Sequence, residues 1–246
     1  MAAFLRVLGR MLLALCLTSA SAAAADGLVL SSGMHEPWTN AEGTGFTNVF
    51  VKELFARLGL KAEVVFNPAA ARALQLADDG TDDGLAARIA GLEKEYPNLV
   101  RVPEPIFIND FVAAGPPGAQ PIRTWDDLRP HSVAHILGWQ VFEHNLPPVR
   151  ELTTAKDSKQ LMGLLKAARV ETILHERWQA VWQAREQGVD MSIHEPPLVS
   201  TPMYMYLHRR HADLIPRVAT ELAAMKAEGR AKAIMAQTLS RAGKSK

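Results

Sequence analysis

The sequence has almost no cysteine. Among 246 residues only Cys16 is a cysteine, so the 221 residues that follow residue 25 contain none. That stretch has no disulfide and no thiol nucleophile, and its stability has to come from a packed core. Hydrophobic residues make up 48% of the chain and charged residues 22%, which is the composition of an ordinary globular protein.

An excess of charge of either sign is also missing. Without Arg6 and Arg10, 25 basic residues remain against 26 acidic residues, a net charge of −1. A chain this close to neutrality offers little that would bind the phosphate backbone of a nucleic acid. We therefore expect no nucleic-acid partner.

Sequence signatures of common enzymes are absent as well. The chain has no G-x-S-x-G, no phosphate-binding loop and, beyond residue 25, no cysteine nucleophile. Two of its histidine pairs, His131 with His135 and His208 with His211, fall in predicted strand or loop, and neither has a third ligand at a recognisable distance. We expect no cofactor, no metal ion and no enzymatic activity.

Long hydrophobic runs are lacking, and the one at the start is short. Arg6 and Arg10 precede the apolar residues 11–17, and small residues at 19–25 provide A-x-A cleavage options. This order is typical of a cleavable signal peptide, and the apolar run is too short to span a bilayer. We predict that residues 1–25 direct export to the periplasm and are removed.

What the chain does have is a regular alternation of strand-like and helix-like segments. Short apolar runs predict strands over residues 27–32, 61–66, 99–102, 111–114, 132–136, 149–152, 172–174 and 203–207, and a further strand that follows the turn Asp83-Gly84 and ends at Arg88. Helical spacing or composition predicts helices over residues 47–58, 69–77, 139–145, 158–168, 177–187 and 214–228. Such alternation favours parallel strands with crossover helices, and therefore an α/β fold.

The alternation restarts after the boundary Gly115-Pro116-Pro117-Gly118, which indicates two lobes. The last part offers only one strand and one long helix, too little for a core of its own, so we expect it to return to the first lobe. The predicted domains are residues 26–112 with 200–246 as lobe 1 and residues 113–199 as lobe 2. Each is a mixed sheet flanked by helices, and two hinge segments join them.

Several segments in this order resemble the small type 2 periplasmic solute-binding proteins, bacterial extracellular family 3, related to the amino-acid-binding components of ABC importers. They are GTGFTNVFVKELFARLGL, RALQLADDGTDDGL, PEPIFINDFVAA, TWDDLRPHSVAHILGW and VETILHERW. The resemblance implies a two-lobed fold of type II and a ligand cleft that closes as a hinged clamp. It also implies an inner-membrane ABC permease as partner, and we expect a monomer.

Residues just after the strands are the candidates for the cleft, because the carboxyl ends of parallel strands meet at one crevice. Arg88 ends a predicted strand and can bind a carboxylate through two of its guanidinium nitrogens; the alternative is a surface pair with Asp82 or Asp83. Arg72 follows Pro68 on a helix and either points into the cleft or is exposed.

Two further loops supply candidates. Glu36 and Trp38 follow the first strand, where the resembling family has an acidic or aromatic cleft wall, and Trp38 either stacks on a ligand or folds over the lobe edge. Gly138 and Trp139 lie at a strand-to-helix turn whose N–H groups can receive an anion, unless Gly138 only makes the turn. Glu176 matches a family position whose acid takes a ligand amine; alternatively it is a favourable charge at a helix N-terminus.

Two departures from the family concern the ligand. Amino-acid-binding relatives carry serines where this chain has Ala86 and Ala87, and an arginine roughly where Tyr96 stands. The predicted ligand is therefore broad: a small polar or aromatic solute, amino-acid-like or an organic acid. Two alternatives stay open, a dehydratase-like periplasmic enzyme on the same scaffold and an accessory or sensory module.

Overall fold

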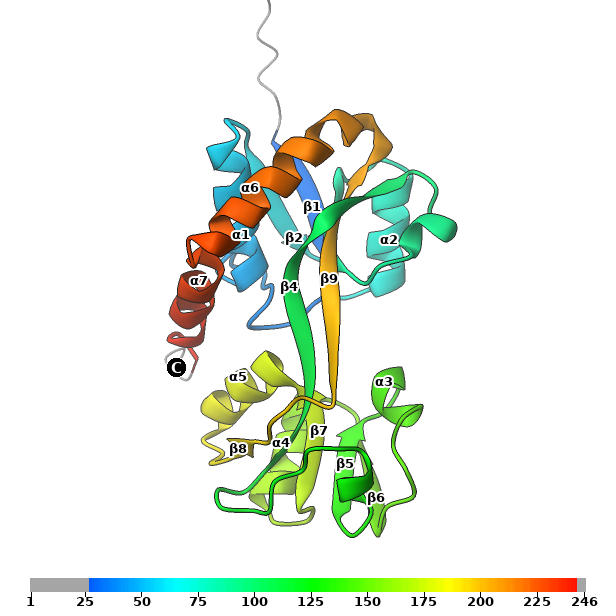
Figure 1. Cartoon of the computed structure of the whole chain (residues 1–246), viewed down its shortest axis with the longest axis vertical. Coiled ribbons are helices and arrows are strands. Elements are labelled where there is room, and N and C mark those ends of the chain that lie inside the picture. Colours follow the sequence, from blue (N-terminus) through cyan, green and yellow to red (C-terminus); the bar gives the residue numbers. More distant parts are fainter. Residues whose placement is uncertain (1–26, 243–246) are drawn as a thin grey trace, which may run out of the picture.

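The computed structural model describes residues 27–242 and divides them into two halves joined by a pair of long strands (Figure 1). The predicted signal peptide, Cys16 and residues 243–246 of the basic tail lie outside the described residues. Among the described helices, none is long and apolar enough to cross a membrane.

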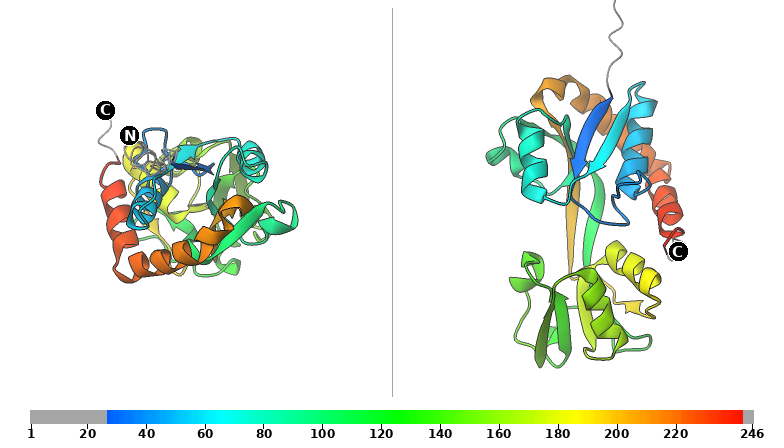
Figure 2. Two further views of the ribbon diagram at one scale, coloured as in Figure 1. Left: turned by 90° about the horizontal axis from the view of Figure 1, so that it is seen from above. Right: turned by 180° about the vertical axis from the view of Figure 1, so that it is seen from behind.

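The first half is built on three parallel strands with β1 in the centre, paired to β2 on one side and β3 on the other. Helices α1, α6 and α7 cover one face of this sheet and α2 the other (Figures 1 and 2). The elements of this half are β1 Leu28–Ser32, α1 Phe46–Arg57, β2 Ala62–Phe66, α2 Ala70–Asp78, β3 Gly84–Arg88, the 3-10 helices Leu92–Lys94 and Arg209–Leu214, α6 Ile215–Ala227 and α7 Arg230–Leu239.

The second half repeats this plan, with β5 paired in parallel to β6 and β7. Helices α4 and α5 pack on one face of its sheet, and the short α3 and a 3-10 turn pack on the other. Its elements are the 3-10 helix Asp126–Leu128, β5 Ser132–Ile136, α3 Gln140–Glu143, β6 Glu151–Ala155, α4 Ser158–Lys166, β7 Thr172–Glu176, α5 Arg177–Gln187 and β8 Ser192–Ile193.

Two antiparallel strands, β4 Leu99–Gly115 and β9 Val199–His208, run through both halves (Figure 1). Their pairing extends from Leu99 opposite His208 to Phe111 opposite Val199. In the first half β9 also pairs with β3, and in the second β4 also pairs with β7, so one hydrogen-bonded sheet is continuous through the molecule. The exact lobe boundaries at residues 112/113 and 199/200 stay a prediction.

The sequence explains why α5 begins and ends where it does. Glu176 is the N-cap, and its carboxylate accepts hydrogen bonds from the backbone N–H groups of Trp178 (3.0 Å) and Gln179 (2.9 Å). At the other end Gly188 has a φ of 60°, the left-handed conformation that glycine adopts without strain. Glu176 therefore stands at the start of α5, and its hydrogen bond from Trp38 shows that this helix end faces the first half.

Three expectations about elements were wrong in detail. Residues 99–102 and 111–114 are not separate strands but parts of β4, because the chain stays extended across Pro103 and Pro105 and absorbs them in register shifts near Pro105. The expected helix 139–145 is the four-residue α3. The chain after β9 forms two helices, because Gly229, with a φ of 76°, ends α6 and starts α7.

Helices α6 and α7 carry the end of the chain back onto the first half. Leu222 on α6 is fully buried in the core cluster formed with α1, β1 and β4. Arg230 at the start of α7 forms two hydrogen bonds with the carboxylate of Glu53 on α1 (2.9 and 2.6 Å). The first half therefore depends on residues from both ends of the described chain.

We expect Leu222→Ala to lower the free energy of unfolding by about 2–5 kcal/mol, since it removes buried methyl groups and leaves a cavity. The control is Thr220→Ala on the exposed face of α6, which should change it by less than about 0.5 kcal/mol. Urea denaturation followed by circular dichroism measures both. Equal effects of the two substitutions would contradict the described packing of α6.

Candidate binding cleft

The cleft lies between the two halves and consists of two adjoining cavities. The hinge compartment, about 500 Å³, is lined by Met34, Ile89, Asn109, Phe111, Gly138, Trp139, Val141, Glu176, Gln179, Thr201 and Met203. The charged compartment, about 590 Å³, is lined by His35, Glu36, Thr39, Asn40, Ala41, Glu42, Phe66, Ile136, Trp139, Lys156, Asp157, Ser158, Lys159, Gln179 and Gln183. Trp139 and Gln179 line both, so the two cavities form one cleft.

Both halves contribute to the cleft through the carboxyl ends of their parallel strands. The loop after β1 brings Met34 and Glu36, and the residue after β3 is Ile89. In the second half the turn after β5 brings Trp139, and β7 ends at Glu176. This is the crevice at which open α/β sheets bind ligands.

Aromatic rings hold Trp139 in place at the boundary of the compartments. Its ring is parallel to that of Phe142 at 5.9 Å (3°) and edge-on to Phe111 at 6.2 Å (87°). His175 contacts it edge-on at 4.9 Å, and burial lowers the pKa of His175 to about 4. The His175 ring is therefore neutral at pH 7: Nδ1 accepts from the backbone N–H of Glu176 (2.7 Å), and Nε2 lies 2.8 Å from Ser158 Oγ. Trp139 and the rings around it therefore give the cleft a planar, uncharged wall.

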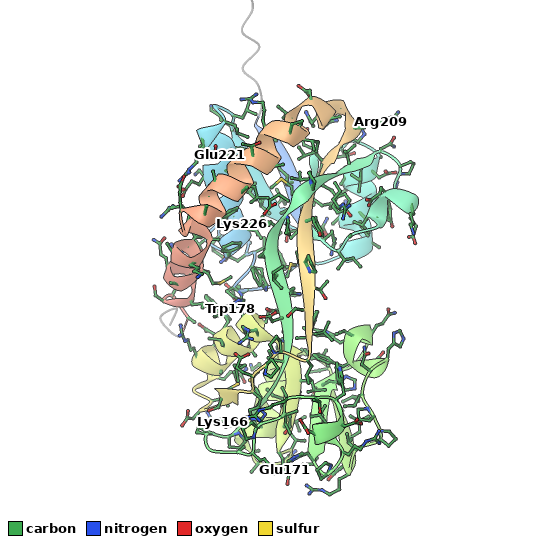
Figure 3. The ribbon with its side chains drawn as sticks, in the orientation of Figure 1. Lys166, Glu171, Trp178, Arg209, Glu221 and Lys226 are labelled. Atoms are coloured by element: carbon green, nitrogen blue, oxygen red, sulfur yellow. The ribbon has the colours of Figure 1, made fainter. Side chains whose placement is uncertain are left out.

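Trp38 and Glu176, two of the predicted ligand-binding residues, bind each other across the two halves. The indole Nε1–H of Trp38 donates to Glu176 Oε2 at 2.9 Å, and both side chains are buried. The Trp38 ring stacks on Phe107 of β4 at 3.8 Å. Trp178, the second residue of α5, lies on the side of the second half that faces the first (Figure 3). The contact ties the loop after β1 to the N-terminus of α5.

Burial raises the pKa of Glu176 to about 7, although the hydrogen bonds from Trp178, Gln179 and Trp38 act in the opposite direction. The carboxylate accepts these three N–H groups in its ionised form. Burial is the largest cause of the raised pKa, and the negative charge of Asp110 acts in the same direction, because both disfavour the ionised form. Glu176 is consequently a buried acid whose pKa lies near neutral pH.

The charged compartment carries opposite charges on its two sides. Glu36 and Glu42 come from the first half, and Lys156 and Lys159 come from the second, which also supplies Asp157, whose carboxylate accepts a hydrogen bond from the backbone N–H of Gln160. Glu36 also accepts a hydrogen bond from Asn40 Nδ2 at 3.3 Å. The sides therefore attract each other when the halves approach, an effect that salt screens at exposed groups.

Of the other predicted site residues, Gly138 lines the cleft, whereas Arg88 and Arg72 do not. Arg88 is half-buried at the end of β3, opposite Tyr204 of β9, and burial lowers its pKa; it lines neither compartment. Arg72 is exposed on α2 and lines neither compartment. Gly138 lines the hinge compartment with a φ of 84°, and its N–H already donates to Glu143 Oε1 at 2.6 Å. Ligand-binding roles for these residues stay predictions.

Sequence reasoning missed the residues that the hinge strands contribute. Asn109 and Phe111 of β4 and Thr201 and Met203 of β9 line the hinge compartment, whereas Ile108 lines a separate groove. The alternation in the segment IFINDF would have identified Asn109 and Phe111 as one face of a strand. Asn109 is 7% exposed, and its Oδ1 has no hydrogen-bond partner among the described residues.

No protein-family model matches the chain, and no curated protein matches it by sequence. Solved structures do match over nearly the whole chain. The GluR0 ligand-binding core in complex with L-glutamate has 14% identity and a TM-score of 0.69, covering 88% of this chain and 99% of that chain. The second substrate-binding domain of a putative amino acid ABC transporter from Streptococcus pneumoniae has 16% identity and a TM-score of 0.66, covering 87% and 99%.

A third similar structure is a histidine kinase sensor domain with similarity to periplasmic binding proteins. It has 16% identity and a TM-score of 0.62, covering 87% of this chain and 96% of that chain. The predicted fold is confirmed: the chain has the two-lobed α/β fold of periplasmic binding proteins. The three similar structures are ligand-binding or sensing domains by their descriptions.

The raised pKa of Glu176 predicts a pH dependence of stability. Between the ordinary glutamate pKa of 4.5 and about 7, the folded state holds the proton that the unfolded state has lost, so the contribution of Glu176 to stability falls as pH rises through this window. Glutamine does not titrate, so Glu176→Gln lacks this pH dependence. We expect the wild type to lose, relative to Glu176→Gln, on the order of 1–3 kcal/mol of unfolding free energy between pH 4.5 and pH 8.

Urea titrations of both proteins at several pH values measure this difference, and the pH dependence of all other groups cancels in it. A difference that does not change with pH would show that Glu176 titrates normally.

Proposed function

We propose that the protein captures a small polar or aromatic solute in the cleft between its two lobes. The observation that supports this is the pair of adjoining cavities lined from both halves at the carboxyl ends of their strands. A solute there touches both lobes at once, so its binding energy favours the arrangement in which the lobes are close. Capture of this kind needs complementary contacts and no activated nucleophile.

The hinge strands suit such a clamp. β4 and β9 are the long elements that run through both halves (Figures 1 and 2), and their register shifts lie near Pro105, at the edge of the first half, where Pro105 lies opposite Tyr204 and Tyr204 pairs with Arg88 of β3. Proline lacks the N–H that a regular ladder needs, so the pair is less uniformly hydrogen-bonded there. Small changes in backbone angle at such positions rotate one half against the other.

We further propose export to the periplasm by the signal peptide at residues 1–25, action as a monomer, and delivery of the solute to an inner-membrane ABC permease. The similarity to a substrate-binding domain of a putative ABC transporter supports the delivery role. The similarity to a histidine kinase sensor domain favours, as a second candidate, a sensory module that uses the same cleft. A dehydratase-like enzyme is the weaker alternative, because the oxygens of Glu176 already accept three N–H groups.

A thermal-shift screen against amino acids, organic acids, amines and neutral aromatic compounds tests solute capture. Binding to the folded state raises the melting temperature, with a stabilisation of about 2.7 kcal/mol at a ligand concentration 100 times Kd. We expect Thr201→Trp, which fills the hinge compartment, to weaken binding of any hit at least tenfold. Ile108→Trp on the other face of the hinge is the matched control and should bind normally.

Three results of the screen contradict solute capture by the cleft. No shift with any compound would favour a module that binds no solute. Equal binding by Thr201→Trp and the control would place the ligand elsewhere. Consumption of a hit by catalytic amounts of protein would favour the enzyme.

A further inference from the structure

The hinge compartment offers uncharged groups to its occupant. Apolar or aromatic side chains line most of it, and its uncharged polar side chains are Asn109, Gln179 and Thr201. Among the residues that the structure describes, no lysine or arginine lines it. Its one ionisable group is Glu176, which the indole of Trp38 and two backbone N–H groups already engage.

This lining disfavours a charged group on the part of the ligand that enters. A carboxylate would leave water without meeting a cation, and it would approach a second carboxyl, that of Glu176. An ammonium group would find three of the about four acceptor positions of the Glu176 carboxylate already taken by N–H donors. The lysines of the cleft, Lys156 and Lys159, lie in the charged compartment, together with Glu36, Glu42 and Asp157.

The aromatic walls favour a flat body. Trp139 is held by Phe142 and Phe111, so its ring presents a fixed surface on which a ring can stack. Ile89, which lines the same compartment from the first half, is 53% exposed, so a bound ring would cover part of its apolar surface. A cavity of about 500 Å³ is in the range of small-molecule sites.

Asn109 provides the specific polar recognition. It is more than nine-tenths buried in the lining of the compartment, with an amide oxygen that lacks a partner among the described residues. A buried polar atom without a partner is unfavourable until a donor satisfies it. A side-chain amide presents a donor beside an acceptor, which complements a ligand edge that carries an N–H beside a carbonyl or ring nitrogen.

From these observations we propose that the solute is an uncharged, planar ring compound with an amide-like donor–acceptor edge, as in a nucleobase or an aromatic carboxamide. Its ring stacks on Trp139, and its polar edge pairs with Asn109. This inference rests on the proposed solute capture and makes it specific: the ring enters the hinge compartment without a carboxylate or an ammonium group.

The test uses matched ligand pairs that differ in one charge. Isothermal titration calorimetry at pH 7.5 compares nicotinamide with nicotinate, and uracil with orotate, and includes adenine, L-glutamate and L-arginine. We expect the neutral member of at least one pair to bind at least tenfold more tightly than its carboxylate, and neither amino acid to bind as tightly as that neutral compound.

The protein variants test the site. Asn109→Leu keeps the size of the side chain but removes the amide, and we expect it to weaken binding of the neutral ligand at least tenfold. Gln179→Met on α5 is a second cleft variant, for which we expect a smaller loss of affinity. It serves if circular dichroism shows that Asn109→Leu is unfolded. The control Ile108→Ala changes the neighbouring residue, which lines a different groove, and should bind normally.

The outcomes separate this inference from the proposed function. Charged members or amino acids that bind as tightly as the neutral compounds would overturn the ligand class and leave solute capture standing, most directly if Arg88→Gln abolished that binding. If neutral compounds bind Asn109→Leu, Gln179→Met and the wild type with equal affinity, the hinge compartment is not their binding site. No binding here and none in the thermal-shift screen would overturn both.

Discussion

The antiparallel pairing of β4 with β9 is the interaction on which the rest of the structure depends. Each half attaches its parallel sheet to this pair, the first through β3 on β9 and the second through β7 on β4. The distance between the halves, and therefore the cleft, is set by how far the two strands stay paired beyond each half. The cleft also takes part of its lining from this pair, including Asn109 and Thr201, which lie opposite each other.

The contact between Trp38 and Glu176 adds a second constraint. A buried carboxylate is unfavourable unless it is hydrogen-bonded, and here the donors come from both halves: the indole from one, and the start of α5 from the other. The carboxyl that links the halves thereby has little hydrogen-bonding capacity left for a ligand. The recognition of a solute then falls to neutral groups and aromatic faces, which is the physical basis of the proposed ligand class.

The sequence predicted the helices and strands well where the local pattern was strong. The expected bounds of β5 and α5 agree with the structure, because a short β-branched run and a capped helix between Glu176 and Gly188 are set by neighbouring residues. Prediction failed where local signals conflicted with the tertiary arrangement. Pro103 and Pro105 indicated a break, yet pairing with β9 keeps β4 extended. Gly229 indicated an end, yet α7 follows and is held by Glu53.

The sequence by itself determined the alternation of strands and helices, the two-lobed fold and the absence of disulfides after residue 25, because these follow from short-range periodicity and composition. Only the tertiary structure decided which side chains meet in the cleft. Trp38 and Glu176, both predicted to bind the ligand, are 138 residues apart in the sequence, and a hydrogen bond joins them in the structure. Hydrogen bonding between buried groups depends on distance and direction in space, which no spacing along the chain specifies.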